Sequence, residues 1–442
     1  MKKYAFCLSA ACLIGSNVWA QDQTYDARSL AMGGAGAATA NARNAAFLNP
    51  AAAAGEKDKF ALEFPIVSAR FLDANSLQKD ADTLSTNANN LTNALTSFQN
   101  AMTALQANPT TANATAVQSA SSTAGTALTN FNTSLNTVSG KSLTGGLFAG
   151  ALLAVPGSTL GVALMVDGRA ELGGQFNYAA ADNSTVTNLA SAMNSCGAAT
   201  GTATQIATAC QTAANSVGTG GQVTGLQSQL LVRGVVSKDV GITLAHHFDV
   251  WDGVDIGVTP KFTQLRTFDI ASSAQSGNGV STSYGANSEN SSSVFNMDVG
   301  ALKTLSRNGD SEIKVAVVVK DLMSKNVKTV LGNDITIKPR ATVGVGYVTD
   351  LVSANVDVDV ITNKQMIAGF GADSQFIRLG AEFDAWKWAQ VRVGYRHDLK
   401  GNYKGLPSLG LGLSPFGVHL DLSVAAAAKN EVAAALQTGF HF

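Results

Sequence analysis

The sequence predicts an all-β fold, a transmembrane barrel of about 14 antiparallel strands. Three observations carry this prediction. The chain begins with a segment typical of export, its second half alternates apolar and polar side chains, and it ends on an amphipathic segment closed by Phe442. Together they predict a protein of the outer membrane of a Gram-negative bacterium, with outer-membrane lipid as its immediate partner.

The first 20 residues have the form of a secretory signal peptide. Two lysines precede an uncharged apolar run over residues 4–15, and small residues lead up to Ala20. Cleavage there predicts a mature chain that begins at Gln21. The residues before Cys12 lack the large aliphatic side chain of a lipid-attachment site, which argues against a lipoprotein.

Composition and cysteine content agree with export. Charged residues make up 14% of the chain, the net charge is -1 and no basic block occurs, so the sequence gives no basis for nucleic-acid binding. Outside the predicted signal peptide only Cys196 and Cys210 remain, both in one polar stretch. We expect a disulfide that closes this stretch. A metal or redox pair is the alternative, but there is no CxxC motif and no nearby histidine, and we predict neither metal nor cofactor.

One segment competes with the barrel interpretation. Residues 145–166 form a run of 22 residues without charge, long enough to cross a bilayer as a helix. A Pro-Gly-Ser-Thr sequence at 156–159 interrupts the centre of this run, and four further glycines surround it. Pro and Gly in this arrangement favour a tight turn between two strands.

The rest of the chain reads as short segments with a period of two. Alternation of this kind predicts strands with one apolar face and one polar face, which in an outer-membrane barrel contact lipid and lumen respectively. A soluble sandwich would give the same alternation. The predicted strands are 60–71, 142–155, 159–176, 228–249, 254–272, 293–305, 311–322, 335–349, 353–364, 372–384, 389–398, 406–414, 417–427 and 431–442.

The connections between these strands favour the membrane barrel. Every second connection is very short, whereas the bulk of the connecting chain lies in 72–141, 177–227, 273–292 and 323–334. Short turns at one end and long loops at the other are typical of outer-membrane barrels. The tryptophans outside the signal peptide all fall in or beside short turns, as a periplasmic aromatic girdle requires: Trp251, Trp386 and Trp388. The last predicted strand resembles the C-terminal strand of such barrels, which ends on an aromatic residue.

The two long inserts differ in pattern. In 72–141, apolar residues repeat every seven positions on both sides of Pro109, which predicts a helical hairpin that projects from the barrel. This hairpin is either a self-packed cap or, through residues 73–140, a surface for an envelope protein partner. The insert 177–227 is rich in Ala, Thr, Asn and Ser, and we interpret it as a polar loop closed by the cysteine pair. Residues 273–292 read as a plain loop.

Two motifs near the mature N-terminus point to a family. Residues 26–36 read DARSLAMGGAG and residues 44–51 read NAAFLNPA. They resemble the start of the long-chain fatty acid transporter (FadL-like) superfamily of outer-membrane barrels, where an Arg-containing segment runs into GMGGAG and is followed by NPA. Within that superfamily the chain is most similar to the branch described as conjugal transfer TraF-like proteins, also over 257–262 and 337–341.

The resemblance implies a barrel over 60–442 with an N-terminal plug, residues 21–59, folded inside it. Movement of the plug would open a path for apolar ligands, and cargo would leave sideways through a gap in the wall. A glycine pair in the third predicted strand, Gly173 and Gly174, is a candidate kink for such a gap. The plug residues carried over from the motifs are Arg28, Gly33, Gly34, Gly36, Asn49, Pro50 and Ala51.

Charged residues on the polar faces of the strands read as lumen charges. We expect them to pair across neighbouring strands, with a lesser role in holding the plug or binding a carboxylate headgroup: Asp357, Asp359, Arg378, Glu382, Arg392, Arg396 and Asp421. No catalytic motif occurs. His419 and Ser423 share a strand face, but four residues of extended chain separate them by roughly 13 Å, beyond hydrogen-bond reach.

Two functions therefore remain, and neither is enzymatic. The first is binding or passive transport of a small hydrophobic compound, as the resemblance implies. The second is a structural or assembly role in a conjugation or secretion system of the outer membrane, with the helical insert as docking surface. An outer-membrane lipid hydrolase is disfavoured, because the sequence lacks the geometry of a catalytic triad.

Overall fold

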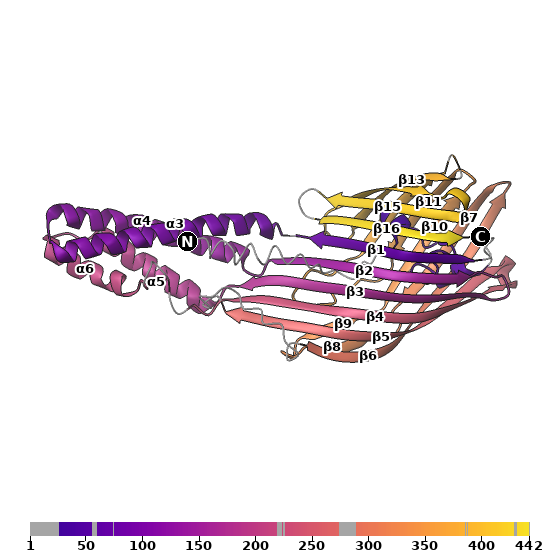
Figure 1. Ribbon diagram of the computed structural model, residues 1–442, viewed down its shortest axis with the longest axis horizontal. Helices are drawn as coiled ribbons and strands as arrows, with labels where there is room; N and C mark the ends of the chain where they lie inside the picture. The colour runs from indigo at the N-terminus through magenta and orange to yellow at the C-terminus, as the bar shows by residue number, and fades with distance from the viewer. Residues whose placement is uncertain are drawn as a thin grey trace.

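The computed structural model describes residues 26–54, 60–73, 75–218, 223, 226–273, 289–384, 386, 388–427 and 431–441. The predicted signal peptide (1–20), most of the loop 273–292 and Phe442 lie outside these residues. Fourteen strands of the described chain form one closed antiparallel barrel, in which the first strand pairs with the last (Figure 1). The predicted fold class is thus confirmed.

The barrel strands follow the predicted segments within a few residues. They are β1 (Ala61–Leu72), β2 (Ser142–Val155), β3 (Gly161–Asn177), β4 (Gln229–Phe248), β5 (Val254–Ser273), β6 (Glu289–Asn308), β7 (Ser311–Lys320), β10 (Arg340–Val348), β11 (Val352–Asp359), β12 (Phe376–Phe383), β13 (Ala389–Asp398), β14 (Leu406–Leu413), β15 (Val418–Ala427) and β16 (Glu431–His441).

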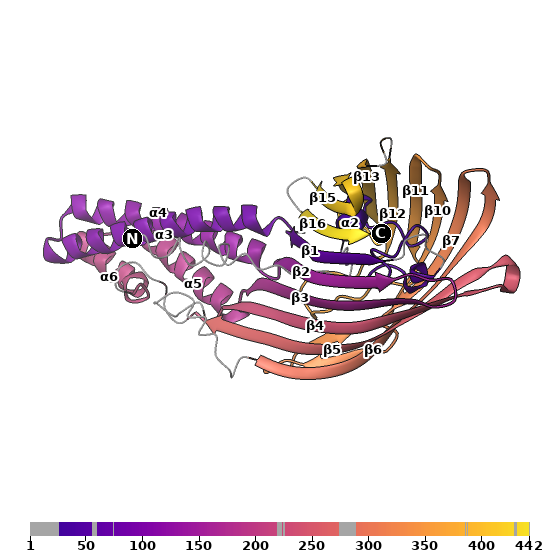
Figure 2. The same ribbon diagram turned by 45° about the vertical axis from the view of Figure 1, so that its right-hand side comes forward.

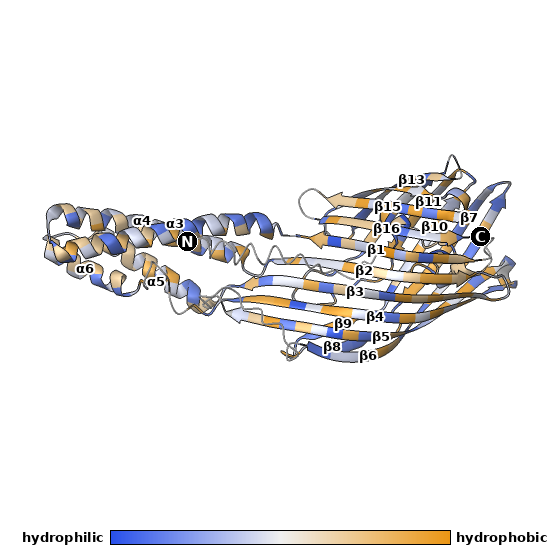
Figure 3. Cartoon of the chain, viewed as in Figure 1, coloured by the Kyte–Doolittle hydropathy of each residue, from blue (hydrophilic) through white to orange (hydrophobic). Residues whose placement is uncertain are grey.

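Side-chain alternation explains why these segments close into a barrel. Along β14 and β15 every second residue is buried and the residues between are exposed. The exposed positions are apolar, for example Leu409 and Leu411, whereas inward-facing Asp421 and His419 are buried. Figure 3 shows the same alternation of hydrophobic and hydrophilic residues along the strands. The wall therefore presents an apolar face outward and a polar face inward, as a membrane barrel requires.

The wall is uneven in height. Strands β4, β5 and β6 have 20 residues each, whereas β11, β12 and β14 have 8 each. The long strands extend toward the end of the barrel that carries the inserts, and the C-terminus lies at the opposite end (Figures 1 and 2). At that opposite end Trp386 and Trp388 are 59% and 52% exposed in the turn between β12 and β13, as predicted for an aromatic girdle.

The run 145–166 forms the end of β2 and the start of β3, with the turn at 156–160 between them. This confirms the two-strand interpretation. No helix among the described residues is long and apolar enough to span a membrane.

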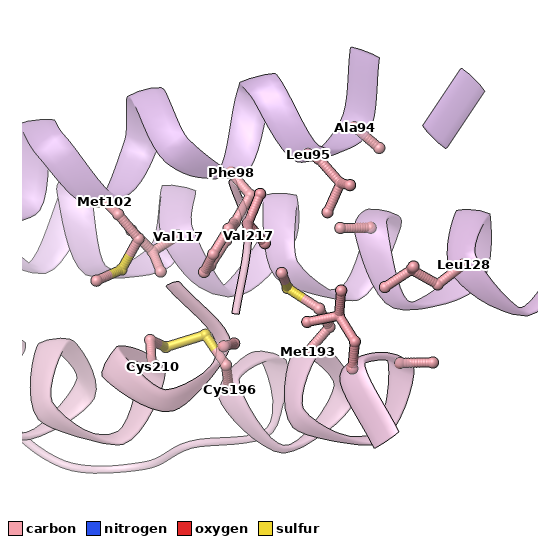
Figure 4. Packing of buried hydrophobic residues seen from close by; sticks show 14 of the residues in the cluster. Ala94, Leu95, Phe98, Met102, Val117, Leu128, Met193, Cys196, Cys210 and Val217 are labelled. Atoms are coloured by element: carbon pink, nitrogen blue, oxygen red, sulfur yellow. A yellow bond between two sulfur atoms is a disulfide. The ribbon is translucent and has the colours of Figure 1, made fainter. Parts of the chain in front are cut away.

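The first insert is the predicted helical hairpin, with α3 (Leu77–Ala107) and α4 (Thr111–Val138). The interpretation of 177–227 as an unpatterned polar loop was wrong, because this insert contains α5 (Ala180–Gly197) and α6 (Ala203–Asn215). Their apolar residues are sparse but fall on one helix face, and that face packs on the hairpin. Figure 4 shows Phe98, Met193 and the Cys196–Cys210 disulfide inside this shared core. The predicted disulfide is confirmed.

The predicted strand 335–349 is two elements. Residues Lys325–Lys328 (β8) and Asp334–Ile337 (β9) form a separate two-stranded sheet, and β10 begins at Arg340. Pro339 explains the break, because proline cannot donate a ladder hydrogen bond. The described residues also contain four short helical turns: α2 (Ala27–Ala31), η1 (Pro50–Ala53), η2 (Val250–Asp252) and η4 (Pro415–Gly417).

Candidate functional site

The N-terminal segment, defined here as residues 26–54, lies inside the barrel. Asp26 caps α2, since its carboxylate accepts hydrogen bonds from the Ser29 amide and hydroxyl at 2.8 and 2.6 Å. Asn49 caps η1 by accepting from the Ala51 amide at 3.1 Å. The α2 turn contacts β13–β16 and β1, and η1 contacts β3–β6. The segment therefore reaches nearly round the inner wall, at the position predicted for a plug.

Glycines in the wall make room for this segment. A Cβ added at Gly394 would lie 2.1 Å from the Gly33 amide nitrogen, and one at Gly257 would lie 2.3 Å from the Pro50 carbonyl carbon. Real Cβ atoms do not approach other atoms so closely, so any larger residue would push the segment away from the wall. The same close approach recurs at Gly161, Gly300, Gly344, Gly346, Gly380 and Gly410.

The glycines of the N-terminal motif are required for a different reason, the conformation of their own backbone. Gly33, Gly34 and Gly36 have φ angles of 69°, 86° and 144°, in the region that L side chains rarely adopt. The backbone turns there, and the amides of Gly36 and Ala37 both donate to the Asp357 carboxylate at 2.9 Å. One predicted lumen charge therefore holds the segment.

A chain of buried ion pairs ties the segment to β12, β13 and β15. The Arg28 guanidinium donates to the Glu382 carboxylate at 2.9 and 3.1 Å. Glu382 also accepts from Arg392 at 2.5 Å, and Arg392 in turn pairs with Asp421. Every charge in this chain faces a charge of opposite sign, which offsets the cost of burying it.

The remaining predicted lumen charges also form ion pairs. Arg378 pairs with Asp359 at 2.7 Å, and Arg396 pairs with Glu431 at 2.5 Å. Glu431 also receives Arg70 of β1, at 2.6 Å. The Arg378–Asp359 and Arg70–Glu431 pairs join neighbouring strands, whereas Arg396 of β13 reaches past β14 and β15 to Glu431 of β16. These pairs do not include the N-terminal segment.

A second charged network was not predicted. Lys261 of β5 pairs with Asp298 at 2.8 Å and with Asp321 at 2.7 Å, and Asp321 also receives Arg340 at 3.0 Å. Nearby, Arg169 of β3 pairs with its neighbours Asp167 and Asp239. Those on β3–β6 follow the same inward alternation as the charges of the short strands, and this pattern in the long strands is the signal that identifies them.

The loop end of the lumen is apolar, in contrast to the charged middle. Inward-facing residues of the long strands β4–β6 pack against the β8–β9 hairpin and residues 366–370. We name this buried group the mouth cluster: Val235, Leu265, Val294, Val327, Ile335, Ile337, Met366, Ile367 and Phe370. A cavity of about 20 Å³ lies between this cluster and the second charged network, lined by Leu265, Ile337, Asp239 and Asp321 among others. That volume holds about one water molecule.

The predicted wall kink is absent at its glycine pair. Gly173 and Gly174 pair with both β2 and β4 without a shift of register. Gly173 faces the lumen, where an added Cβ would lie 2.4 Å from the Phe370 ring, and Gly174 has open space around its Cα. The pair therefore accommodates the mouth cluster instead of bending the wall.

The described residues offer no catalytic arrangement. His419 hydrogen bonds to Glu63 at 2.7 Å, and Ser423 is not among its partners. The same residues contain no group of three or more His, Cys, Asp or Glu side chains that could hold a metal ion.

A family described as "F plasmid transfer operon, TraF, protein" matches residues 46–359. No curated protein matches the chain. Among solved structures, the toluene transporter TbuX of Ralstonia pickettii is 14% identical, with a TM-score of 0.45 over 96% of this chain and 99% of that one. The toluene transporter TodX of Pseudomonas putida is 9% identical, with a TM-score of 0.42 over 95% of this chain and 97% of that one. The assignment of the fold rests on the strand pairing described above.

Proposed function

The chain belongs to the family described as F plasmid transfer operon TraF protein, and from this premise we propose that it is an outer-membrane barrel that binds and passively transports a small hydrophobic compound. The mouth cluster carries this proposal. Its wall residues Val235, Leu265 and Val294 are apolar side chains that face inward, in a barrel whose other inward positions are mostly polar. An apolar lining at the loop end suits an apolar ligand and repels ions.

The N-terminal segment supplies the gate in this proposal. Wall glycines, Asp357 and Glu382 hold it across the lumen, so passage requires it to move. Buried ion pairs are costly to break when one partner is lost, but a segment that leaves as a unit can exchange them for water. The closed arrangement is thus compatible with a second, open one.

The mouth cluster can be tested with an uncharged fluorophore. Purified protein in liposomes is titrated with N-phenyl-1-naphthylamine, which brightens in apolar surroundings. The signal of protein-free liposomes is subtracted, because the probe also enters the bilayer. Leu265→Asn places an amide in the cluster and should weaken probe binding at least about fivefold. The matched control is Leu331→Asn, at a 55% exposed leucine of the β8–β9 tip, which should bind as wild type does. Equal probe binding by Leu265→Asn and Leu331→Asn would contradict the proposal.

A structural or assembly role is the second candidate, favoured by one observation. Helices α3–α6 pack round a hydrophobic core of their own, carry the disulfide, and project from the barrel end (Figure 1). A partner protein that co-purifies in equal amount and is lost when α3–α6 are removed, together with no probe binding, would favour this candidate.

A further inference from the structure

The outer wall of the barrel carries a hollow of about 1020 Å³, comparable to the upper end of ligand sites, about 300–1,000 Å³. Barrel exteriors are ordinarily convex, so this hollow needs a cause. It crosses the outward faces of eight strands, β13–β16 and β1–β4. The outward side chains that line it, here named the outer groove, are Val67, Ala69, Leu147, Ala149, Gly168, Ala170, Val236, Lys238, Val391, Leu409, Leu411, Leu422, Val424, Ala434 and Leu436.

Small residues form the floor of the outer groove. Ala69 pairs with Ala434 on one side, and Ala149 pairs with Gly168 on the other. Large residues such as Leu411 stand on the flank at β14. Because side chains at paired positions point the same way, the missing volume of these small residues adds up across adjacent strands.

Among the described residues, Lys238 is the one charged side chain that faces outward into the outer groove. It is exposed and pairs in register with Gly168 of the floor. Within the described ranges no acidic side chain lies within ion-pairing distance of it. A lysine beside an apolar groove selects a ligand with an anionic head and an apolar tail.

The height of Lys238 matches a lipid headgroup. It lies ten residues from the short-turn end of β4 at Phe248, which is roughly 33 Å along the strand and about 25 Å across the membrane at the usual tilt. That is the height of the apolar band of such barrels, about 25 Å. Lys238 is therefore expected at the loop-side edge of the band.

The neighbouring strands mark the same edge independently. Lys238 pairs with Gln264, and Gln264 pairs with Ser293, so the outward row is polar at this level. One row nearer the short turns, the outward residues are apolar and about half exposed: Val240 (50%), Phe262 (54%) and Phe295 (53%). On β5 and β6 the outward surface therefore turns polar at the row of Lys238.

We propose that the outer groove binds one anionic, phosphate-bearing lipid, with an acyl chain along the Ala and Gly floor and the phosphate at Lys238. This rests on the proposed membrane location, and not on transport. The groove descends from Lys238 toward Val391, which lies two residues from the short-turn end of β13. A chain lying in it would therefore run from headgroup level into the apolar band.

Native mass spectrometry of the full-length mature protein in micelles of tetraethylene glycol monooctyl ether tests this proposal. The probes are dioleoyl-phosphatidylglycerol and dioleoyl-phosphatidylcholine, which differ in the net charge of the headgroup. We expect the first phosphatidylglycerol to bind about fivefold more tightly, the contribution of one lysine near a membrane surface. Lys238→Gln should abolish the preference, whereas Lys325→Gln, an exposed lysine outside the groove, should retain it.

Variants that fill the floor of the outer groove with a larger side chain provide the second part of the test. An added Cβ at Gly168 meets only the Ser237 carbonyl oxygen at 3.9 Å, so Gly168→Leu fits the wall and occupies the groove. It should weaken binding of both lipids at least about tenfold. Gly174→Leu, on the same strand with nothing within 4 Å, is the matched control. Ala434→Leu fills the same floor from β16, should Gly168→Leu fail to fold.

Three results would overturn the proposal. The first is equal lipid binding by wild type and both groove-filling variants. The second is a phosphatidylglycerol preference that survives Lys238→Gln. The third is a dimer that Gly168→Leu dissociates, because the groove would then join two copies of the chain. Heat-modifiable migration on a gel verifies that every variant is folded, so a failure of lipid binding is distinguishable from a failure of the barrel.

Discussion

Arg28 donates two hydrogen bonds to Glu382, which lies 354 residues later in the chain. The pair joins the helical turn α2 inside the lumen to strand β12 of the wall. Arg28 also donates to the Thr39 carbonyl oxygen at 3.0 Å, so one side chain holds both the wall and the far part of its own segment. The position of the N-terminal segment depends on this pair and on the shape of the wall round it.

Loss of the Glu382 charge should release the segment. Glu382→Gln leaves Arg28 without its carboxylate partner and leaves Arg392 with Asp421 alone. Removal of one partner from a buried pair costs about 3–5 kcal/mol. We expect the labelling rate of an Ala40→Cys reporter by a membrane-impermeant maleimide to rise at least about tenfold. Ala40 is 7% exposed in the closed barrel. Asp310→Asn, in an exposed turn, is the control, and unchanged labelling in Glu382→Gln would contradict the proposed hold.

Enlargement of a wall glycine should act in the same direction. Gly394→Val places side-chain atoms where the Gly33 amide lies, so the segment must withdraw from β13. The Ala40→Cys reporter should again label faster, while heat-modifiable migration stays intact because the ladder of β13 is unchanged. Gly174→Val provides the comparison, since open space surrounds that glycine. If the Ala40→Cys reporter is labelled at the wild-type rate in both variants, the wall glycines do not determine the position of the N-terminal segment.

The inserts should be removable together but not singly. Leu72 pairs with Thr144 and Asn177 pairs with Gln229, so an Asn-Gly turn can join each pair of strands directly. A variant without 74–141 and 179–227 should still form a heat-modifiable barrel. Deletion of 74–141 alone exposes the apolar face of α5 and α6, including Val186 and Met193, and should aggregate or be proteolysed. A double deletion that fails to assemble would show that the inserts are part of the barrel's folding unit.

The disulfide should stabilise the helices and not the barrel. Cys196 and Cys210 are fully buried in the core of α3–α6 and lie 14 residues apart. A crosslink over a loop of this length contributes about 3 kcal/mol. Cys196→Ser with Cys210→Ser should therefore speed limited proteolysis within 180–215 while the barrel band persists on the gel. Loss of the barrel band would contradict the separation of the two units.

The sequence was sufficient for the barrel and for much of its lumen. Period-two alternation identified the strands because an apolar outward face and a polar inward face leave a strong pattern. The same alternation placed Asp359, Arg378 and Arg392 in the lumen, where they pair across strands.

Features that depend on packing between distant segments could not be predicted in this way. Gly380 and Gly394 look like ordinary strand glycines, and only the approach of residues 32 and 33 gives them a reason. The helices α5 and α6 are rich in Thr, Ser and Asn, so tertiary packing on α3 and α4 outweighs a weak local pattern. The outer groove arises from small residues on strands far apart in sequence, and no local window contains them.

A reversible tether of the N-terminal segment tests the central claim most directly. The Ala38 Cβ lies 3.3 Å from a Cβ built at Gly346, close to the spacing of a disulfide, about 3.5–4.5 Å. With uptake by protein-free liposomes subtracted, Ala38→Cys with Gly346→Cys should take up N-phenyl-1-naphthylamine slowly when oxidised. After reduction it should match the Gly346→Cys single variant, which controls for crowding of Thr39 by the added Cβ, at 2.6 Å. Wild type with the same reductant controls for the native disulfide. Equal uptake by the oxidised and reduced forms, with the tether verified by mass, would contradict a barrel gated by its N-terminal segment.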